Sequence, residues 1–180
     1  MQLSNQRIVI TGAGGGIGRA LTAELASKGA RLCLLVRHSE PGVPSLTLDM
    51  ARDAQTFTWA CDVSRADQRD KAINAVQRAW GGGDVLINLA GVLDFRPFQD
   101  EDPAMLQRMI QVNVEAPMQL ARALLPGMLE RGRGRIVNVG SMFGSIGFPF
   151  FAAYSATKFA LRGYSQALRR ELAGTGVGVT

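Results

Sequence analysis

The segment from Thr11 to Gly18, Thr-Gly-Ala-Gly-Gly-Gly-Ile-Gly, constrains the fold of this chain more than any other stretch. It follows an apolar run, Arg7 to Thr11, and opens a helical pattern that continues to Lys28. Glycines between a strand and a helix leave the N–H groups of the helix start bare, and the helix dipole there favours an anion. The segment therefore predicts a phosphate-binding turn in an α/β protein.

The spacing of the glycines, Gly12-x3-Gly16-x-Gly18, makes the prediction more specific. A side chain at Gly12 or Gly16 would keep a pyrophosphate from the backbone, and one at Gly18 would push the helix away from the sheet. The common Gly-x-Gly-x-x-Gly spacing fails because Ile17 occupies its third glycine position, and no Gly-Lys-Ser/Thr follows to make a P-loop. A structural turn that binds no ligand stays open as the alternative. The turn also contains Gly14 and Gly15.

Apolar runs of strand length alternate with helical patterns along the chain. The runs are apolar throughout, as expected for parallel strands covered by helices on both faces. Repeated strand–helix order predicts a doubly wound Rossmann fold of three layers, α/β/α, forming a single domain over residues 1–180. The predicted strands are Arg7 to Thr11, Arg31 to Val36, Thr56 to Cys61, Asp84 to Leu89, Arg135 to Val139 and Gly176 to Thr180. The predicted helices are Ile17 to Lys28, Ala66 to Trp80 with Ser64 as a cap candidate, Pro103 to Leu129 and Phe151 to Leu172.

Two segments depart from this regular pattern. Pro117 lies within the third helix and should bend it just after Asn113, because proline lacks a backbone donor and clashes with the preceding turn. From Arg37 to Gln55 the periodicity is poor, and Pro41, Gly42 and Pro44 predict a loop before a short helix at best.

Composition excludes several functional classes. With 180 residues, 47% hydrophobic and 19% charged, the chain has enough apolar content for one packed domain, and its longest apolar runs fall far short of a membrane span. The first residues lack the apolar stretch of a signal peptide, so we expect a cytoplasmic protein. A net charge of +5 comes from scattered basic residues without interleaved aromatics, which argues against nucleic acid as a partner. Cys33 and Cys61 have no metal-ligand spacing and are expected to be buried free thiols.

The end of the second strand indicates which dinucleotide binds. An acidic residue there usually accepts hydrogen bonds from the adenosine ribose, but this sequence reads Val36-Arg37. Arg37 can pair with a 2′-phosphate, so NADP(H) is the preferred cofactor, while nearby His38 and Glu40 leave NAD(H) possible. An ordinary surface arginine is the alternative interpretation.

Tyr154 and Lys158 stand four residues apart near the start of a helix and project from the same face. A neighbouring ammonium favours the phenolate of the tyrosine, which can then exchange a proton with an oxygen on a carbon that exchanges a hydride. Ser141, after the fifth strand, is placed to donate to a carbonyl oxygen, or else caps a turn. Asn113 could offer its amide or its backbone carbonyl to a water beside Lys158, or else be a polar surface residue.

Together these motifs resemble the short-chain dehydrogenase/reductase family over essentially the whole chain. The matching positions are Thr11-Gly-x3-Gly16-Ile17-Gly18, Asp62-Val63, Asn88-Leu89-Ala90-Gly91, Asn113, Ser141 and Tyr154-x3-Lys158.

The resemblance implies a role for each matching residue. Tyr154 would be the general acid/base, and Lys158 would promote its ionisation and bind the nicotinamide ribose. Ser141 would orient the substrate oxygen and Asn113 would hold a proton-relay water. Asp62 and Val63 would contact adenine, and the cofactor side of the sheet would be supported by Asn88, Ala90 and Gly91. No metal is implied.

The sequence departs from the family at two points. Leu89 replaces a usual asparagine, which should alter stability more than chemistry. The chain stops at Thr180, inside the sixth strand, whereas family members continue with a segment that shapes the substrate pocket, so we expect this C-terminal part to be missing. Because of that segment's absence, a non-catalytic nucleotide-binding module is the rival interpretation. An epimerase or dehydratase usually needs a larger substrate domain.

Apolar residues between Ser141 and Tyr154 suggest an apolar carbonyl or alcohol substrate, although they could equally form core or dimer surface. These residues are Met142, Phe143, Ile146, Phe148, Phe150 and Phe151. The family builds dimers on its third and fourth crossover helices, so we expect a homodimer or higher homo-oligomer. Apolar surface on the last helix supports this expectation, from Ala152, Ala160, Leu161, Leu168 and Leu172.

Overall fold

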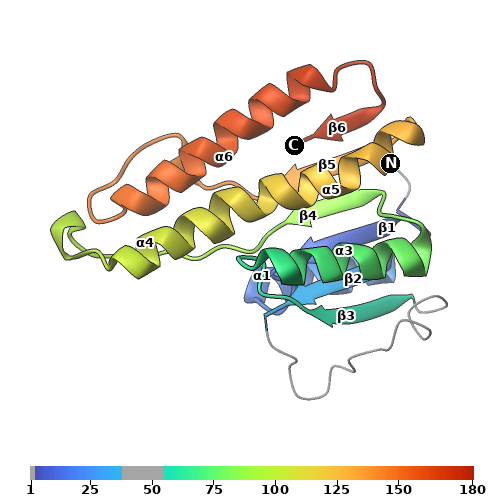
Figure 1. The fold of residues 1–180 in the computed structure, drawn as a ribbon, viewed down its shortest axis with the longest axis horizontal. Coiled ribbons are helices and arrows are strands. Elements are labelled where there is room, and N and C mark those ends of the chain that lie inside the picture. Colours follow the sequence, from blue (N-terminus) through green and yellow to red (C-terminus); the bar gives the residue numbers. More distant parts are fainter. Residues whose placement is uncertain (1–2, 38–54) are drawn as a thin grey trace.

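Each predicted apolar run forms a strand, and all six strands lie parallel in one sheet of order β3-β2-β1-β4-β5-β6 (Figure 1). The computed structural model describes residues 3–37 and 55–180. The strands are β1 (Arg7–Thr11), β2 (Arg31–Val36), β3 (Thr56–Ala60), β4 (Val85–Asn88), β5 (Gly134–Asn138) and β6 (Val177–Val179). Every predicted strand is confirmed to within one residue at each end. The doubly wound, Rossmann-like fold is therefore confirmed.

Helices cover the sheet on both faces and bury two separate apolar clusters. The larger cluster packs α3 (Ala66–Trp80), α5 (Ala116–Glu130) and α6 (Ala152–Glu171) against one face. The smaller cluster packs α1 (Gly16–Ser27) against Ile8, Ile10 and Leu32 on the other face. Figure 1 shows α3 and α5 in front of the strands and α1 behind them. This arrangement explains why the strands are apolar on both sides.

The long third helix is interrupted at the predicted place. It runs as α4 (Pro103–Ile110), then a π-helical turn, η2 (Gln111–Glu115), and then α5. The N–H of Ala116 bonds the Gln111 carbonyl five residues back, and Pro117 stands at the second residue of α5. Such π turns are often found at functional sites.

Several predictions require correction or fall outside the described residues. Ser64 does not cap α3, because the cap position is Arg65 and the Ser64 side chain bonds Asp62 instead. Leu161, Leu168 and Leu172 are buried within the chain, so they provide no spare dimer surface. Both cysteines are buried and free, as predicted. The segment expected to be a loop with a short helix, together with His38 and Glu40, lies almost wholly outside the described residues.

Two loops, each with a short helical turn, complete the edge where the strands end. One loop follows β4 and leads through η1 (Phe98–Asp100) to α4, and the other follows β5 and leads through η3 (Met142–Gly144) to α6. In Figure 1 both loops extend from the arrowhead end of the sheet. Ligands of open α/β sheets bind at this edge.

Candidate cofactor and active site

A cleft of about 580 Å³ opens at the carboxyl edge of the sheet, and it collects most of the predicted cofactor residues. Pockets of this size are typical of small-molecule sites. The predicted residues that line it are Gly12, Gly14, Gly15, Gly16, Ile17, Gly18, Arg37, Asp62, Val63, Ala90 and Gly91. Sequence reasoning missed further lining residues, among them Arg108 and Val112.

The glycine turn contains both obligatory glycines and open ones. Gly12 has φ +69°, and a β-carbon there would lie 2.8 Å from the backbone of Ala90. A β-carbon on Gly18 would overlap the Gly12 carbonyl oxygen and lie 2.7 Å from Ala13. A β-carbon on Gly16 would meet no described atom within 4 Å. The predicted reason for Gly18, helix-to-sheet contact, is therefore corrected: the turn's own backbone excludes a side chain.

Thr11 and Asn88 form hydrogen bonds that fix the end of β4 and the turn after it, next to the cleft. The Thr11 hydroxyl accepts hydrogen bonds from the N–H groups of Leu89 (3.1 Å) and Ala90 (3.0 Å). The Asn88 amide donates to the Asn138 side chain at 2.8 Å, which joins β4 to β5. Both residues are buried and neither lines the cleft, so their hydrogen bonds fix the end of β4 and the turn that follows it.

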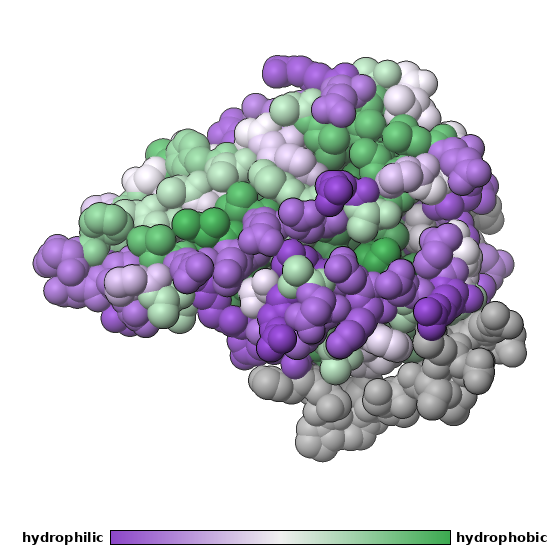
Figure 2. Space-filling model, viewed as in Figure 1, coloured by the Kyte–Doolittle hydropathy of each residue, from purple (hydrophilic) through white to green (hydrophobic). Residues whose placement is uncertain are grey.

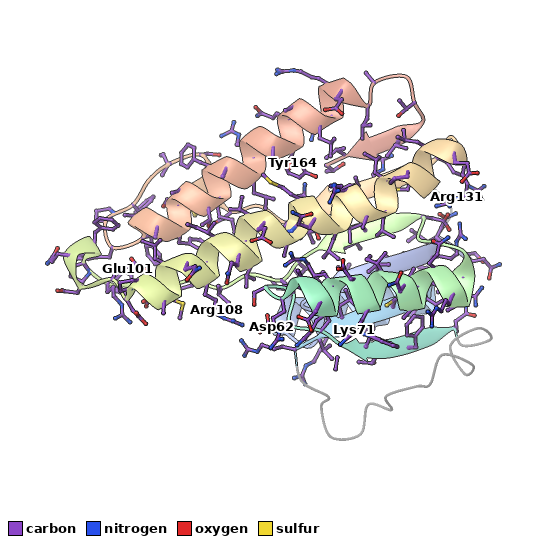
Figure 3. The ribbon with its side chains drawn as sticks, viewed as in Figure 1. Asp62, Lys71, Glu101, Arg108, Arg131 and Tyr164 are labelled. Atoms are coloured by element: carbon purple, nitrogen blue, oxygen red, sulfur yellow. The ribbon has the colours of Figure 1, made fainter. Side chains whose placement is uncertain are left out.

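At the end of the cleft near α3, Asp62 is fixed by two neighbours. Its Oδ1 accepts from the backbone N–H (3.0 Å) and the hydroxyl (2.8 Å) of Ser64, and its Oδ2 accepts from Arg108 at 3.1 Å. Figure 3 shows Arg108 reaching from α4 toward Asp62. Partial burial alone would raise the pKa of Asp62, but the Ser64 and Arg108 hydrogen bonds outweigh burial, and the pKa lies below its ordinary value.

Arg69 was not anticipated as a site residue, yet it connects the two ends of the site. The side chain is buried, donates to the Val63 carbonyl at 2.7 Å and pairs with Glu115 of η2 at 2.8 Å. The available signal was its position on α3, three residues before buried Ala72 and seven before buried Val76, which places it on the apolar face. A buried arginine with two partners fixes the elements that it joins.

Tyr154 and Lys158 meet on one face of α6, as predicted. The Lys158 ammonium lies 5.7 Å from the centroid of the Tyr154 ring and donates to the Val139 carbonyl at 3.0 Å. Lys158 is buried, and desolvation lowers its pKa because burial disfavours the charged form. A second cavity of about 260 Å³ is lined by Lys158 together with Ser141, so these two predicted residues lie close together.

Asn113 is buried in η2, so its interpretation as a polar surface residue is wrong. Its side-chain oxygen accepts from the Val92 N–H (2.9 Å), and its amide donates to the Val92 carbonyl (2.8 Å) and to Thr157 (3.1 Å). The amide is therefore fully engaged. The backbone carbonyl lacks its usual helical donor, since that position is Pro117.

Gly91 and Ser141 lie near Lys158 at the other end of the site. A β-carbon on Gly91 would lie 3.6 Å from the Asn113 side-chain oxygen and 3.9 Å from the Lys158 ammonium, so three predicted residues converge there. Ser141 caps η3, accepting from the Phe143 N–H at 3.2 Å. Because the hydroxyl accepts in this bond, its own proton stays available for donation.

Comparison with known proteins identifies the family. Residues 6–180 match the family described as short chain dehydrogenase. The chain belongs to the short-chain dehydrogenase family. It is 35% identical to a short chain dehydrogenase of Pseudocercospora fijiensis, over 98% of this chain and 58% of that protein. It is 34% identical to a 2-(S)-hydroxypropyl-CoM dehydrogenase of Xanthobacter autotrophicus, over 99% of this chain and 70% of that one. The family is one of oxidoreductases.

Solved structures of this family superpose on the fold. A metagenomic short-chain oxidoreductase in complex with NADP matches with a TM-score of 0.88 and 36% identity, over 100% of this chain and 81% of that one. A gluconate 5-dehydrogenase from Burkholderia cenocepacia, in complex with NADP and tartrate, matches with a TM-score of 0.84 and 29% identity, over 98% and 69%. This chain thus spans between about three fifths and four fifths of the length of these relatives.

The described part of the chain contains neither a helix that could span a membrane nor a cluster of metal-ligand side chains. No helix in residues 3–37 and 55–180 has the length and apolar character needed to cross a membrane. In the same ranges, no three or more His, Cys, Asp or Glu side chains gather as a metal ion would require.

Proposed function

We propose that this short-chain dehydrogenase uses NADP(H) in preference to NAD(H) to exchange a hydride with the carbon of a ketone or secondary alcohol. The observation that carries the proposal is the convergence of Gly91, Asn113, Lys158 and Tyr154 beside the glycine-lined cleft. A binding module has no use for a buried ammonium beside a tyrosine and a helix carbonyl without its usual donor, because burying a charge is costly.

The cleft fits a dinucleotide. The open space at Gly16 leaves room for phosphates at the start of α1, where the helix dipole favours anions. Val63 lines the cleft, and its N–H has no hydrogen-bond partner among the described residues, so it can donate to an adenine nitrogen beside Asp62. A bound nicotinamide dinucleotide would supply or accept the hydride.

Proton transfer falls to residues of α6 and η2. Tyr154 would donate its hydroxyl proton to a substrate oxygen in the reducing direction, and Lys158 would stabilise the resulting phenolate by its charge. The Asn113 carbonyl, which lacks its usual helical donor because that position is Pro117, would hold a water that returns a proton to Tyr154 and Lys158. Ser141 would orient the substrate oxygen by donating to it.

The test of the catalytic role replaces Tyr154 by Phe. Turnover should fall by about 10²-fold or more, while the Kd for NADPH stays within about twofold, because only the proton donor is lost. Turnover is measured by NADPH absorbance with a panel of ketones and alcohols, and binding by nicotinamide fluorescence. Nicotinamide binding without turnover by the unaltered chain would favour a non-catalytic nucleotide-binding module.

The cofactor preference rests on Arg37, which lies exposed at the rim of the cleft after β2. A charge-assisted contact with the 2′-phosphate should make NADPH bind at least about tenfold more tightly than NADH. Arg37→Glu should reverse the order of the two affinities, since the carboxylate repels the phosphate and accepts from ribose hydroxyls. Relatives solved with NADP support this choice. Equal affinities of the unaltered chain for both cofactors would contradict it.

A further inference from the structure

Aromatic rings surround Tyr154 on the side of the loop that precedes α6. The ring of Phe143 lies 6.1 Å from the Tyr154 ring at an interplanar angle of 89°, and the ring of Phe151 lies 6.4 Å away at 59°. Phe143 and Phe151 are themselves 4.8 Å apart. The proton donor of the proposed reaction is therefore part of a packed aromatic group.

The group extends over two loops at the carboxyl edge of the sheet. The ring centroids of Phe148 and Phe143 are 5.1 Å apart. Phe95 belongs to the loop after β4, and its ring centroid lies 4.9 Å from that of Phe151 and 5.5 Å from that of Phe150. We call these five phenylalanines, Phe95, Phe143, Phe148, Phe150 and Phe151, the aromatic wall. Figure 2 shows hydrophobic residues gathered over the end of the molecule where α6 begins.

The wall is held in place by the backbone. Phe150 has φ +66°, a left-handed conformation that a bulky residue seldom adopts. The Arg96 N–H donates to the Phe150 carbonyl at 3.2 Å, which joins the two loops. Backbone strain of this kind concentrates at ligand sites, where surrounding contacts maintain it.

The aromatic wall itself presents apolar surface. Phe95, Phe148 and Phe150 are each about half exposed, at 60%, 46% and 50%. The loop that carries Phe143 to Phe151 has no charged residue, and the charges beside Phe95 pair with each other, Arg96 to Asp94 at 2.6 Å. The five rings supply no counter-ion of their own, and the cations of α6, Lys158 and Arg162, line the second cavity. A flat apolar group finds ring faces and edges on this surface.

We propose that the aromatic wall binds the aryl group of a neutral aryl ketone, or of the matching aryl alcohol, with its oxygen at the Tyr154 hydroxyl. This inference rests on the proposed function and names its substrate class. In the reducing direction the ketone carbon gains a hydride from the reduced dinucleotide, the ketone oxygen gains the Tyr154 proton, and one proton taken up from the solvent reprotonates Tyr154. The balanced products are the secondary alcohol and the oxidised dinucleotide.

The first experiment measures binding. Saturation-transfer NMR follows 1-phenylethanol with the NADP⁺-loaded chain, with the Phe143→Ala variant, and with a control variant, Phe159→Ala. Phe159 is an exposed aromatic of α6 that belongs to no ring contact in the described residues. Saturation of the ligand's ring protons is expected in the unaltered chain and the control and should be largely lost in Phe143→Ala. Unchanged saturation in Phe143→Ala, or none in the unaltered chain, overturns the proposal.

The second experiment compares kcat/KM for acetophenone, butanone and pyruvate with NADPH. The kcat/KM for acetophenone should exceed that for pyruvate at least tenfold. Phe143→Ala should lower kcat/KM for acetophenone about tenfold more than for butanone, the size of effect that a pocket contact supplies. The proposal is overturned if Phe143→Ala lowers kcat/KM equally for acetophenone and butanone, or if pyruvate is the best substrate.

The two experiments separate the wall from the proposed function. Aryl binding without turnover of any carbonyl supports the aryl site at the aromatic wall and contradicts the proposed function. Turnover of a carbonyl without aryl binding supports the proposed function and contradicts the aryl site. A fall in molar mass of Phe143→Ala by light scattering, at unchanged NADPH affinity, would assign the wall to contact with a second copy of the chain and overturn the proposal.

Discussion

Single residues in the glycine turn have separable roles. Gly18→Ala should destabilise the fold by about 1–3 kcal/mol, because its new methyl group overlaps the backbone of Gly12 and Ala13. Gly16→Ala adds the same methyl group to open space, so the free energy of unfolding should change by less than about 1 kcal/mol while NADPH affinity falls. Urea unfolding and cofactor titration of both variants check this pair. A Gly16→Ala variant that binds NADPH normally would contradict phosphate placement at that position.

Burial of the Lys158 ammonium lowers the free energy of unfolding by an amount that depends on pH. Its pKa is lowered from 10.5 by desolvation, so between the lowered pKa and 10.5 the unfolded chain binds more protons than the folded chain. Stability contributed by this group therefore rises with pH through that window and is lowest below it, where both states carry the charge. The free energy of unfolding of Lys158→Met, minus that of the unaltered chain, should fall as the pH rises toward 10.5. Urea unfolding from pH 7 to 10.5 measures it, and a constant difference would contradict the prediction.

At the scale of elements, the site depends on how η2 is attached to its neighbours. Arg69 joins the turn after β3 to η2, through Val63 and Glu115. Arg69→Met leaves the buried Val63 carbonyl without its partner, and the free energy of unfolding should drop by about 1–3 kcal/mol. NADPH affinity should fall as well, because the turn at Val63, which lines the cleft, loses its support.

Glu115→Gln is the matched control for Arg69. The amide oxygen still accepts from the guanidinium, and the Glu115 side chain is 43% exposed, so the stability change should stay below about 1 kcal/mol. Thermal or urea unfolding and NADPH titration of both variants provide the readout. Equal NADPH affinity in Arg69→Met and the unaltered chain would limit Arg69 to a structural role.

The whole molecule has apolar surface that the fold itself does not cover. Ile110 of α4 and Leu129 of α5 are 47% and 40% exposed. We predict a homodimer built on these helices. Light scattering at micromolar concentration should give twice the chain mass, and Ile110→Glu should lower it by placing a charge in the contact. A monodisperse monomer before substitution would contradict the dimer.

The sequence was sufficient to predict the positions of the strands and helices and the order of the motifs along the chain. All six strands and the helices from Ala66 and Phe151 are found within one residue of their predicted ends, because their apolar periodicity reflects burial that is the same along the whole element. The long helix was predicted as one piece with a bend, and the structure resolves the bend into the π turn before Pro117. Whether the backbone there forms α or π hydrogen bonds depends on the missing N–H of Pro117 and on the packing around the turn.

Side-chain partners between distant elements were beyond the reach of the sequence. Arg69, Arg108 and the contacts of Phe95 join residues that are far apart in the chain, and only the packing of α3, α4 and two loops brings them together. The same packing buries the leucines of α6 that the sequence assigned to a dimer surface.

The sequence by itself determined the parallel sheet, the glycine turn at its edge and the residue types available for chemistry, because strand burial and backbone approach impose short-range patterns. The tertiary structure decided which groups are free to act. It engages the Asn113 amide, desolvates Lys158 and gathers the aromatic wall around Tyr154. Hydrogen-bond occupancy, desolvation and ring packing depend on neighbours in space, and those neighbours exist only once the crossovers have folded onto the sheet.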